Sequence, residues 1–426
     1  MIAFAGLSHL GLVSAAAAAS KGFEVVGFDP DPVLVARMAA GDLPVYEPEL
    51  DALVASCSPR LRFSSEPTSL RNADVIVLAR DVPTDEHGKS DLGPLESLIA
   101  AVVREARPGC EVVVLSQVSP GFTRRMAAAS PPGLHWYYQV ETLVFGQAVE
   151  RATRPERLIV GCEDPTQPLP AAYRELLESF GCPILPMRYE SAELTKVSIN
   201  MCLVASVTVA NTMAELSERV GADWSEVVPA LRLDRRIGPH AYLNPGLGLS
   251  GGNLERDLAT VRALAYEHGT EAGLVEASLT SSRYRKNWLL RTLASEVLGP
   301  VEFPTVAVWG LAYKPGTHST RNSPALALLE SLGDATVLAH DPRVELPPGR
   351  FPNVEQVDDP LDACRGADAL VIATPWPMYA SIDPRRIRRA LRGRVVIDPF
   401  SLVDPSASGL VHHRLGRPVV SEEVLT

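Results

Sequence analysis

The stretch MIAFAGLSHLGLVSAAAAASKGFEVVGFD, residues 1–29, decides the fold of the first part of the chain. Its opening residues form an apolar run typical of a buried strand, and the alanine run after the turn belongs to a helix that ends at Gly22. A second strand-like segment, EVVGFD, spans residues 24–29 and ends at Asp29. Strand, turn, helix and strand in this order predict a βαβ unit, in which the two strands are parallel.

The turn of this unit reads Gly6-x-Ser8-x-x-Gly11, and Asp29 ends the next strand. In a dinucleotide-binding unit, backbone N–H groups at the helix start hold the pyrophosphate and the acid binds the ribose hydroxyls. Ser8 replaces the usual middle glycine, so its Cβ is expected to shift or weaken the cofactor, although its hydroxyl could donate to a phosphate. An acid such as Asp29 favours NAD over NADP, because it repels a 2′-phosphate. A βαβ unit that binds nothing is the alternative.

The rest of the chain continues this pattern, with one interruption. Apolar runs at residues 73–79 and 110–116 extend a doubly wound sheet to about residue 190. Long helical segments follow, the first of them unbroken by proline and closed by Gly221, and strand-like runs return after residue 300. The expected fold is α/β, with two Rossmann-like doubly wound domains joined by a helical domain with a long central helix. The expected domains are residues 1–190, 191–295 and 296–426.

Composition excludes several classes of function. The 426 residues carry a net charge of -11, which argues against general nucleic-acid binding. No apolar run approaches the roughly 18 to 20 residues of a membrane span, and the apolar N-terminus lacks the basic region of a signal peptide. The six cysteines have no paired spacing, so we expect no disulfide framework, no metal site and a reducing cytoplasmic location.

Seven motifs, in order along the chain, extend the analysis beyond the first unit. Together they resemble the UDP-glucose/GDP-mannose dehydrogenase family over nearly the whole sequence. The resemblance implies an N-terminal NAD domain, a long central helix that builds a homodimer, and a C-terminal domain that holds the diphosphate of a nucleoside-diphosphate sugar. The family oxidises a sugar C6 alcohol to a carboxylate with two NAD. The motifs are GLSHLG with FDPD, VYEPELDAL, DVPT with SDL, ETLVFGQA, AELTKVSIN, RIGPHAYLNPGLGLSGG and GLAYKPGTHSTRNSP.

The central helix carries the clearest candidates for catalysis. Lys196 and Asn200 are four residues apart, so both project from one face of a helix, and they match the family's active-site lysine and asparagine. Such a pair could stabilise an alkoxide as hydride leaves, or order a water that takes the proton. A solvated lysine with a surface asparagine is the alternative. Glu141 matches a glutamate that assists the family's later hydrolytic steps, and Asp257 matches the acid that ends its cysteine loop.

The same resemblance assigns residues to the two ligands. On the cofactor side it adds Pro83, Thr84 and Gln117 to the glycine turn and its acid. On the nucleotide-sugar side, besides Glu141, it implies the residues Arg236, Tyr242, Gly246, Gly248, Lys314 and Arg321.

One position departs from the family pattern. Asn253 stands where the family has its cysteine, whose thiolate attacks the aldehyde intermediate and forms a thioester after a second hydride transfer. An asparagine cannot do this. Cys202 is no substitute, since six residues after Lys196 it points about 240° round the helix axis. Gln117 replaces the threonine of a Ser-Thr-Val motif near the nicotinamide. The family's Phe, Pro and Lys after the cysteine are also changed, to Leu254, Glu255 and Arg256.

These observations favour an NAD-dependent enzyme that performs one two-electron oxidation of a nucleotide sugar. Three alternatives stay open: an epimerase or isomerase that oxidises its substrate transiently, a full four-electron oxidation through the aldehyde hydrate, and a noncatalytic homologue. The retention of Lys196, Asn200, Glu141 and Asp257 argues against the last. The sugar, the base and the pathway are not fixed by the sequence.

Overall fold

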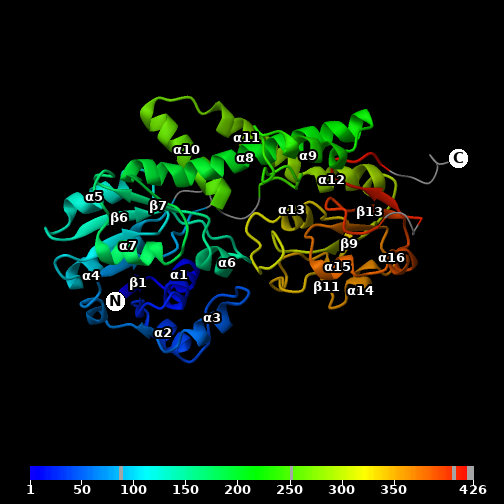
Figure 1. Cartoon of the computed structure of the whole chain (residues 1–426). Coiled ribbons are helices and arrows are strands. Elements are labelled where there is room, and N and C mark those ends of the chain that lie inside the picture. Colours follow the sequence, from blue (N-terminus) through cyan, green and yellow to red (C-terminus); the bar gives the residue numbers. More distant parts are fainter. Residues whose placement is uncertain (86–89, 250–252, 405–408, 420–426) are drawn as a thin grey trace. The chain divides into compact units, whose positions relative to one another are not determined.

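The structure is a computed structural model, and it describes residues 1–85, 90–249, 253–404 and 409–419 (Figure 1). The chain divides into two compact units, Met1–Ile199 and Asn200–Thr426, and each is considered by itself below. The three-part division expected from the sequence stays a prediction.

The first unit is built on an eight-stranded sheet in the order β3-β2-β1-β4-β5-β6-β7-β8. All neighbouring strands are parallel except β6 and β7, which are antiparallel. Strands β1, β2, β4 and β5 are buried at every residue, as expected for parallel strands covered on both faces. The strands are β1 (Ile2–Ala5), β2 (Val25–Phe28), β3 (Leu61–Ser64), β4 (Val75–Leu78), β5 (Glu111–Val114), β6 (His135–Gln139), β7 (Leu158–Cys162) and β8 (Ile184–Arg188).

Helices cover both faces of this sheet (Figure 1). Alternate side chains of β1 enter two separate cores: Ile2 and Phe4 pack on one face with α1, and Ala3 and Ala5 on the other with α4. The doubly wound arrangement predicted from the sequence is therefore confirmed. The helices are α1 (His9–Ser20), α2 (Pro32–Ala39), α3 (Leu50–Ser56), η1 (Pro67–Leu70), α4 (Gly93–Glu105), α5 (Phe122–Ala129), α6 (Ala148–Thr153) and α7 (Ala171–Glu178).

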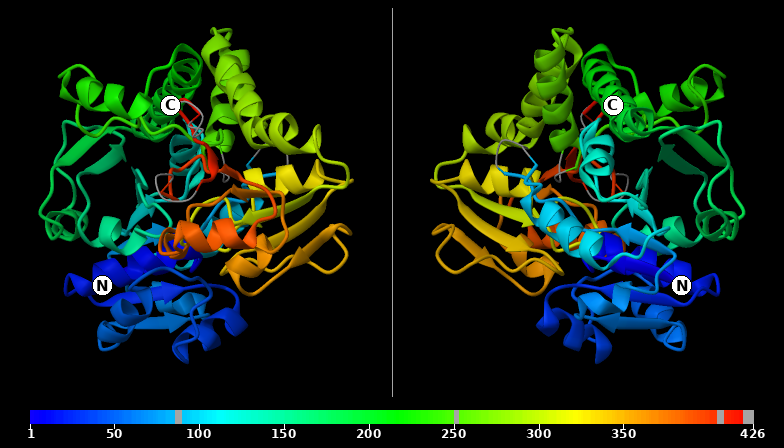
Figure 2. Two further views of the ribbon diagram at one scale, coloured as in Figure 1. Left: turned by 90° about the vertical axis from the view of Figure 1, so that its right-hand side faces the viewer. Right: turned by 90° about the vertical axis from the view of Figure 1, so that its left-hand side faces the viewer.

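The second unit contains a six-stranded, fully parallel sheet in the order β11-β10-β9-β12-β13-β14. This part is yellow to red in Figures 1 and 2. Each of its short helices has a proline in its first turn, where the missing N–H costs no hydrogen bond. The elements are β9 (Thr305–Trp309), α13 (Pro324–Glu330), β10 (Thr336–His340), β11 (Val354–Gln356), α14 (Pro360–Cys364), β12 (Ala369–Ile372), α15 (Pro377–Ala380), α16 (Pro384–Ala390), β13 (Val395–Ile397) and β14 (Val411–His413).

Helices precede this sheet in the chain. The longest, α8 (Tyr189–Val220), has 32 residues and is followed by Gly221 with φ 78°, as the sequence predicted. It is the one helix in the described part of the chain that is long and apolar enough to cross a membrane, a test that core helices also pass. The others are α9 (Trp224–Leu233), α10 (Asn253–His268), α11 (Gly273–Lys286), α12 (Trp288–Leu293) and the π-helical η2 (Ala294–Leu298). The predicted α/β class, with two Rossmann-like sheets and a long central helix, is confirmed.

Candidate active site

The turn after β1 requires glycine at two positions. Gly6 has φ 90°, which L side chains rarely adopt, and a Cβ there would lie 2.9 Å from the Cβ of Arg80. A Cβ on Gly11 would lie 1.7 Å from the carbonyl oxygen of Gly6. Because neither glycine has a side chain, α1 begins at His9 directly after the turn and packs against it.

Asp29 and Ser8 complete this turn. The Asp29 carboxylate accepts hydrogen bonds from the backbone N–H of Leu7 at 2.9 Å and of Asp31 at 3.1 Å. The Ser8 hydroxyl donates to the carbonyl of Ala79 at 3.3 Å and accepts from the N–H of Asp81 at 2.9 Å. The single proton of Ser8 is therefore used within the protein, to tie the turn to the end of β4, rather than being directed at a phosphate.

The other cofactor residues predicted from the sequence lie at the same edge of the sheet. Pro83 and Thr84 follow β4, where the carbonyl of Pro83 accepts from the N–H of Asp91 at 2.9 Å, and Gln117 follows β5. Since β1, β4 and β5 are parallel neighbours, their carboxyl ends meet at one edge, and the strand order reverses between β1 and β4. The glycine cradle, the start of α1 and Asp29 at this switch point fit a dinucleotide such as NAD.

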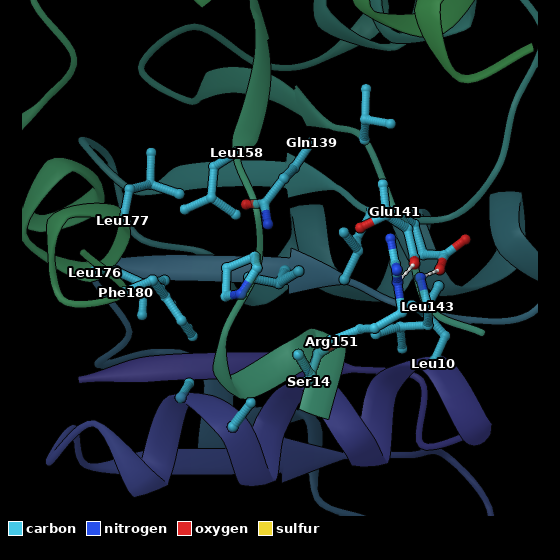
Figure 3. A pocket seen from close by; sticks show the side chains of 18 of the residues that line it. Leu10, Ser14, Gln139, Glu141, Leu143, Arg151, Leu158, Leu176, Leu177 and Phe180 are labelled. Atoms are coloured by element: carbon cyan, nitrogen blue, oxygen red, sulfur yellow. Dashed lines mark hydrogen bonds between the residues drawn. The ribbon is translucent and has the colours of Figure 1, made fainter. Parts of the chain in front are cut away.

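Lys196 and Glu141 form an ion pair in the first unit. Glu141 follows β6, and its Oε2 lies 3.2 Å from Nζ of Lys196 on α8. Its other oxygen accepts from the N–H of Leu143 (Figure 3). The two side chains are only 10% and 16% exposed, so this pair is screened less by water than a surface pair. Lys196 is accordingly no solvated surface lysine.

Asn200 forms a second polar pair one turn further along α8. Its Nδ2 donates to the carboxylate of Asp257 on α10, and both residues are buried. The other Asp257 oxygen lies 3.4 Å from Nε of Arg256. These contacts fix the orientation of the Asn200 amide, and each of the two candidate residues on α8 therefore has its own carboxylate partner.

Glu193 is a site residue that the sequence interpretation missed. It lies three residues before Lys196 on α8, is completely buried, and accepts from the N–H of Gly121 at 2.6 Å and of Thr123 at 2.8 Å. Burial raises the pKa of Glu193, and the hydrogen bonds from Thr123 and Gly121 oppose that shift. Glu193 thus anchors the end of the loop that carries Gln117. In the sequence, the one available signal was its i, i+3 spacing to Lys196.

Glu47 is a second buried carboxylate that the sequence interpretation left without a role. Its Oε2 lies 3.0 Å from Nε2 of His9, whose ring stacks on Phe145 with 4.2 Å between ring centroids. Glu47 also accepts from the N–H of Gly146 at 3.1 Å and of Ala148 at 2.8 Å. It therefore connects the start of α1 to the segment between Glu141 and α6.

A cavity of about 70 Å³ lies behind Glu141 within the first unit. Figure 3 shows Glu141 and Leu143 at one end and Leu177 and Phe180 at the other. The short side chains of the alanine run in α1 form part of its wall. The backbone that carries Glu141 is therefore bordered by a cavity rather than by closely packed side chains.

The glycine-rich loop before α10 is held by side chains of the second unit. Asn211 on α8 accepts from the N–H of Gly246 at 2.7 Å, and Ser282 on α11 accepts from the N–H of Leu249 at 2.8 Å. Gly248 has φ 84°, and a Cβ there would lie 2.7 Å from the carbonyl oxygen of Ser282. Residues 250–252 and the side chain of Asn253 lie outside the described part of the chain, but Asn253 is the first residue of α10. The backbone of the loop is thus fixed up to the position before this gap.

Lys314 and Arg321 lie on the loop between β9 and α13. This loop leaves the sheet at Gly310, which has φ 91°, and folds back so that the N–H of Tyr313 donates to the carbonyl of Ser319 at 3.0 Å. Since β9 lies between β10 and β12, both cations are at the switch point of the second sheet, where ligands of such folds bind. Their positions suit an anionic ligand.

Arg236 and Tyr242 are placed differently. Arg236 is 88% exposed and forms an ion pair with Asp234 at 2.6 Å, and Tyr242 is 55% exposed. Within the second unit, the structure leaves both on the surface.

The cysteines are poor candidates for a replacement nucleophile. All six are free thiols, and burial raises the pKa of Cys110 and Cys364 to about 12 and also raises the pKa of Cys162 and Cys182. Cys202 is exposed on α8. Within the described ranges there is also no group of three or more His, Cys, Asp or Glu side chains that could hold a metal.

Two switch points, one suited to a dinucleotide and one to an anionic ligand, define the class as a protein with two Rossmann-like ligand-binding sheets. Family models agree: residues 1–180 match the NAD binding domain, 190–283 the central domain and 307–405 the UDP binding domain of the UDP-glucose/GDP-mannose dehydrogenase family. The chain belongs to this family of NAD-dependent nucleotide-sugar dehydrogenases.

Individual relatives extend the likeness over the full chain. UDP-glucose 6-dehydrogenase TuaD of Bacillus subtilis is 31% identical over 438 residues, covering 98% of this chain and 94% of the relative. The structure of a UDP-glucose dehydrogenase from Pyrobaculum islandicum has a TM-score of 0.82 at 30% identity, covering 93% of each chain. A UDP-D-ManNAc dehydrogenase from Pyrococcus horikoshii has a TM-score of 0.85 at 24% identity, covering 98% of this chain and 99% of that one, which supports the fold alone.

Proposed function

We propose that this protein performs one NAD-dependent two-electron oxidation of an alcohol on a nucleoside-diphosphate sugar and releases the carbonyl product. The observation that carries the proposal is the pairing of Lys196 with Glu141 in the first unit and of Asn200 with Asp257 in the second. The family resemblance adds the expectation that Asn253 stands at the position of the thiol. The two pairs supply groups that can assist the removal of a hydride, and an asparagine at the thiol position supplies no group that can form a thioester.

The side chains on α8 account for the first step. NAD, when bound, accepts the hydride from the carbinol carbon. The ammonium of Lys196, shielded from water and oriented by Glu141, stabilises the alkoxide that develops on the substrate oxygen. The Asn200 amide, held by Asp257, is a fixed donor or acceptor for the same oxygen or for a water that takes the proton. One alcohol and one NAD⁺ then give one aldehyde or ketone, one NADH and one proton.

The second oxidation lacks its usual route. A thiolate would have to add to the aldehyde and form a thiohemiacetal before a second hydride could leave. Asn253 has no nucleophilic atom for this addition, and four of the six thiols have raised pKa values that keep them protonated near neutral pH. The carbonyl compound is therefore expected to leave the enzyme.

Product stoichiometry tests the proposal. Nucleotide sugars would first be screened by thermal shift with NAD, and NADH would then be followed on the hits. We expect at most one NADH per substrate and a product that hydroxylamine traps, with activity that survives cysteine alkylation. Two NADH and a uronic acid would show oxidation through the hydrate, whereas no net NADH with an isomerised sugar would show an epimerase.

Lys196→Ala tests the role of the ammonium. Loss of a preorganised group at the developing alkoxide should lower kcat by roughly 10²–10³-fold with little change in NAD affinity. Lys21→Ala, at a lysine over the ring of Phe180 in the same unit, is the control and should leave kcat unchanged. A Lys196→Ala enzyme with the wild-type kcat would remove the lysine from the mechanism.

We also propose a homodimer formed through α8. Four apolar side chains on one stripe of this helix, spaced by three or four residues, are 42% to 66% exposed in the second unit. They are Val209, Met213, Leu216 and Val220. Sedimentation at micromolar concentration should show a dimer, which Leu216→Glu should dissociate. A wild-type protein that sediments only at 45.8 kDa would contradict it.

A reducing, cytoplasmic location accompanies this proposal. It is supported by six free cysteines in a chain of net charge -11 that takes soluble nucleotides. Cell fractionation is the direct measurement, and recovery in a membrane or secreted fraction would contradict it.

A further inference from the structure

Glu255, which by the family resemblance stands at the position of a proline, makes two contacts that a proline cannot make. It lies in the first turn of α10, two residues after Asn253. One carboxylate oxygen lies 2.7 Å from Nζ of Lys286, and the other accepts from the side-chain amide of Asn322. The carboxylate is 27% exposed and the lysine 20%, so the pair is partly withdrawn from water. Glu255 therefore connects three segments of the second unit.

The contact with Lys286 joins the end of α11 to the start of α10. Lys286 is the last residue of α11, and a Cβ at Gly248 would lie 3.1 Å from its Cγ. Its aliphatic stem thus runs beside Gly248, and its ammonium ends at Glu255 in the first turn of α10. Arg285, the residue before it, donates to the carbonyl of Gly246 at 3.2 Å. The end of α11 therefore contacts both the described glycines before the gap and the start of α10.

The contact with Asn322 leads to the nucleotide side. Asn322 follows Arg321 directly and has φ 53°, a left-handed conformation that asparagine tolerates better than most residues. The backbone at Asn322 turns the β9–α13 loop into the buried Ser323, whose hydroxyl donates to the carbonyl of Leu311 at 2.7 Å. A side chain that fixes Asn322 therefore also restricts the position of Arg321.

The charge balance favours a positioning role for Glu255. A lone carboxylate beside a segment that binds a diphosphate would repel the ligand, but Lys286 at 2.7 Å offsets that charge locally. The carboxylate has both oxygens occupied by donors of this chain, which leaves it poorly placed to act on substrate.

We propose that Glu255 is a positioning residue that couples the nucleoside-diphosphate segment at Arg321 to the start of α10, which carries Asp257, the partner of Asn200. Binding of the diphosphate at the first segment then restricts the start of α10 at the second. This inference rests on the proposed nucleoside-diphosphate substrate.

Four variants of the full-length enzyme test it. Glu255→Ala removes both contacts, Lys286→Met removes one partner, and the double variant closes a mutant cycle. Glu255→Lys with Lys286→Glu restores an ion pair with reversed charges. As a matched control, Glu276→Gln breaks the pair of Arg262 and Glu276, which also joins α10 to α11 but is about half exposed.

The expected result is a specific loss of coupling. Glu255→Ala and Lys286→Met should each lower kcat/KM for the nucleotide sugar by about tenfold, mainly in kcat, and the double variant should lose no more than either. The charge swap should recover part of kcat. The Kd for UDP should rise by a few-fold while the Kd for NAD stays unchanged, which a general loss of structure would not produce. The control should match the wild type.

Two failures are distinguishable. If UDP and the other nucleoside diphosphates do not bind the wild-type enzyme in titration calorimetry, the proposed substrate class is wrong. If they bind, and the Glu255 and Lys286 variants keep the wild-type kcat/KM or lose it additively, the positioning role is wrong.

Discussion

The two sheets have the same turn at their switch points. In the first unit β1 is followed by Gly6, with φ 90°, whose N–H donates to the carbonyl of Phe28 at 2.8 Å. In the second unit β9 is followed by Gly310, with φ 91°, whose N–H donates to the carbonyl of His340 at 2.8 Å. Each glycine is followed by a leucine whose N–H donates to an aspartate at the end of the neighbouring strand.

The aspartates differ in how fully they are used. Asp29 accepts from two backbone N–H groups among the described residues, and a carboxylate can accept about four hydrogen bonds. Asp341 accepts from the N–H of Leu311, Ala312, Arg343 and Val344 and from the indole of Trp376. Asp29 thus retains capacity for a ribose, while Asp341 is committed to the fold.

The segments after the turns differ as well. In the first unit α1 starts at His9, so backbone N–H groups at a helix start face the switch point. In the second unit a loop with Lys314 and Arg321 comes before α13 begins at Pro324. The same turn can therefore be followed by main-chain N–H donors or by side-chain cations as the groups that suit an anion. Which of the two follows depends on the length of chain before the next helix.

Asp341→Asn gives the largest expected effect. An amide has one accepting oxygen, and its NH₂ would face donors, so about 3 kcal/mol of unfolding free energy should be lost. Urea unfolding followed by tryptophan fluorescence measures it. Asp29→Asn is the matched control and should lose clearly less stability; equal losses would mean that the two aspartates are equally structural.

The next largest expected effect is a loss of stability in acid that comes from a buried histidine of the second unit. His412 on β14 is fully buried, and burial together with Arg414 lowers its pKa from 6.5 to about 4. The unfolded chain binds this proton below pH 6.5 and the folded one only near pH 4, so its contribution to stability is complete above pH 6.5 and is lost as the pH falls. The loss amounts to about 3 kcal/mol, at about 1.4 kcal/mol per pH unit.

A non-titrating variant isolates this contribution from that of the carboxyls. Between pH 6.5 and pH 4, the wild type should lose about 3 kcal/mol more unfolding free energy than His412→Leu. His318→Leu, at an exposed histidine of the same unit, should show no such shift. A difference that is flat with pH would mean that His412 titrates normally in the folded protein.

Asp29→Ala tests the spare capacity of the first aspartate. NAD should bind about tenfold more weakly, because the ribose hydroxyls lose an acceptor, and discrimination against NADP should relax. Fluorescence titration with both cofactors is the measurement. Equal or tighter binding of NADP by the wild type would overturn the assignment.

Arg321→Ala should give the smallest effect, because the side chain is exposed and partly screened. KM for the nucleotide sugar should rise by a few-fold to about tenfold, with the NAD affinity unchanged. Arg365→Ala, at another exposed arginine of the second unit, provides the baseline. If the two variants have the same KM, Arg321 is a surface charge.

The strands that the sequence predicts are those with continuous buried apolar runs, such as β4 and β5. The sequence interpretation missed β6, in which two buried aromatics alternate with more exposed residues, and β8, an edge strand with Pro186 and Arg188. It also missed β14, an edge strand with two histidines, the short strands β3 and β11, and β7, although β7 is apolar and buried at every residue. These strands exist because a neighbour pairs with them, and a single sequence window holds no record of that neighbour.

The candidate site residues also differ in how far the local sequence predicts them. The spacing of Lys196 and Asn200 shows that they share a helix face, but their carboxylate partners are 55 and 57 residues away in sequence. Glu193 is similarly paired with a segment 70 and 72 residues away, and in the sequence it resembles any helical glutamate. Local periodicity predicts which way a side chain projects, whereas burial and pairing depend on contacts between distant segments.

The division of the chain into two compact units, between Ile199 and Asn200, falls inside α8. A cut at this boundary would strip backbone hydrogen bonds from both new ends, leaving carbonyls without donors on one fragment and N–H groups without acceptors on the other. Lys196 and Asn200 would also be parted. Neither half is therefore expected to persist as an independently folding fragment, and recombination of this family's halves by gene fusion should succeed only when the whole of α8 comes from one parent.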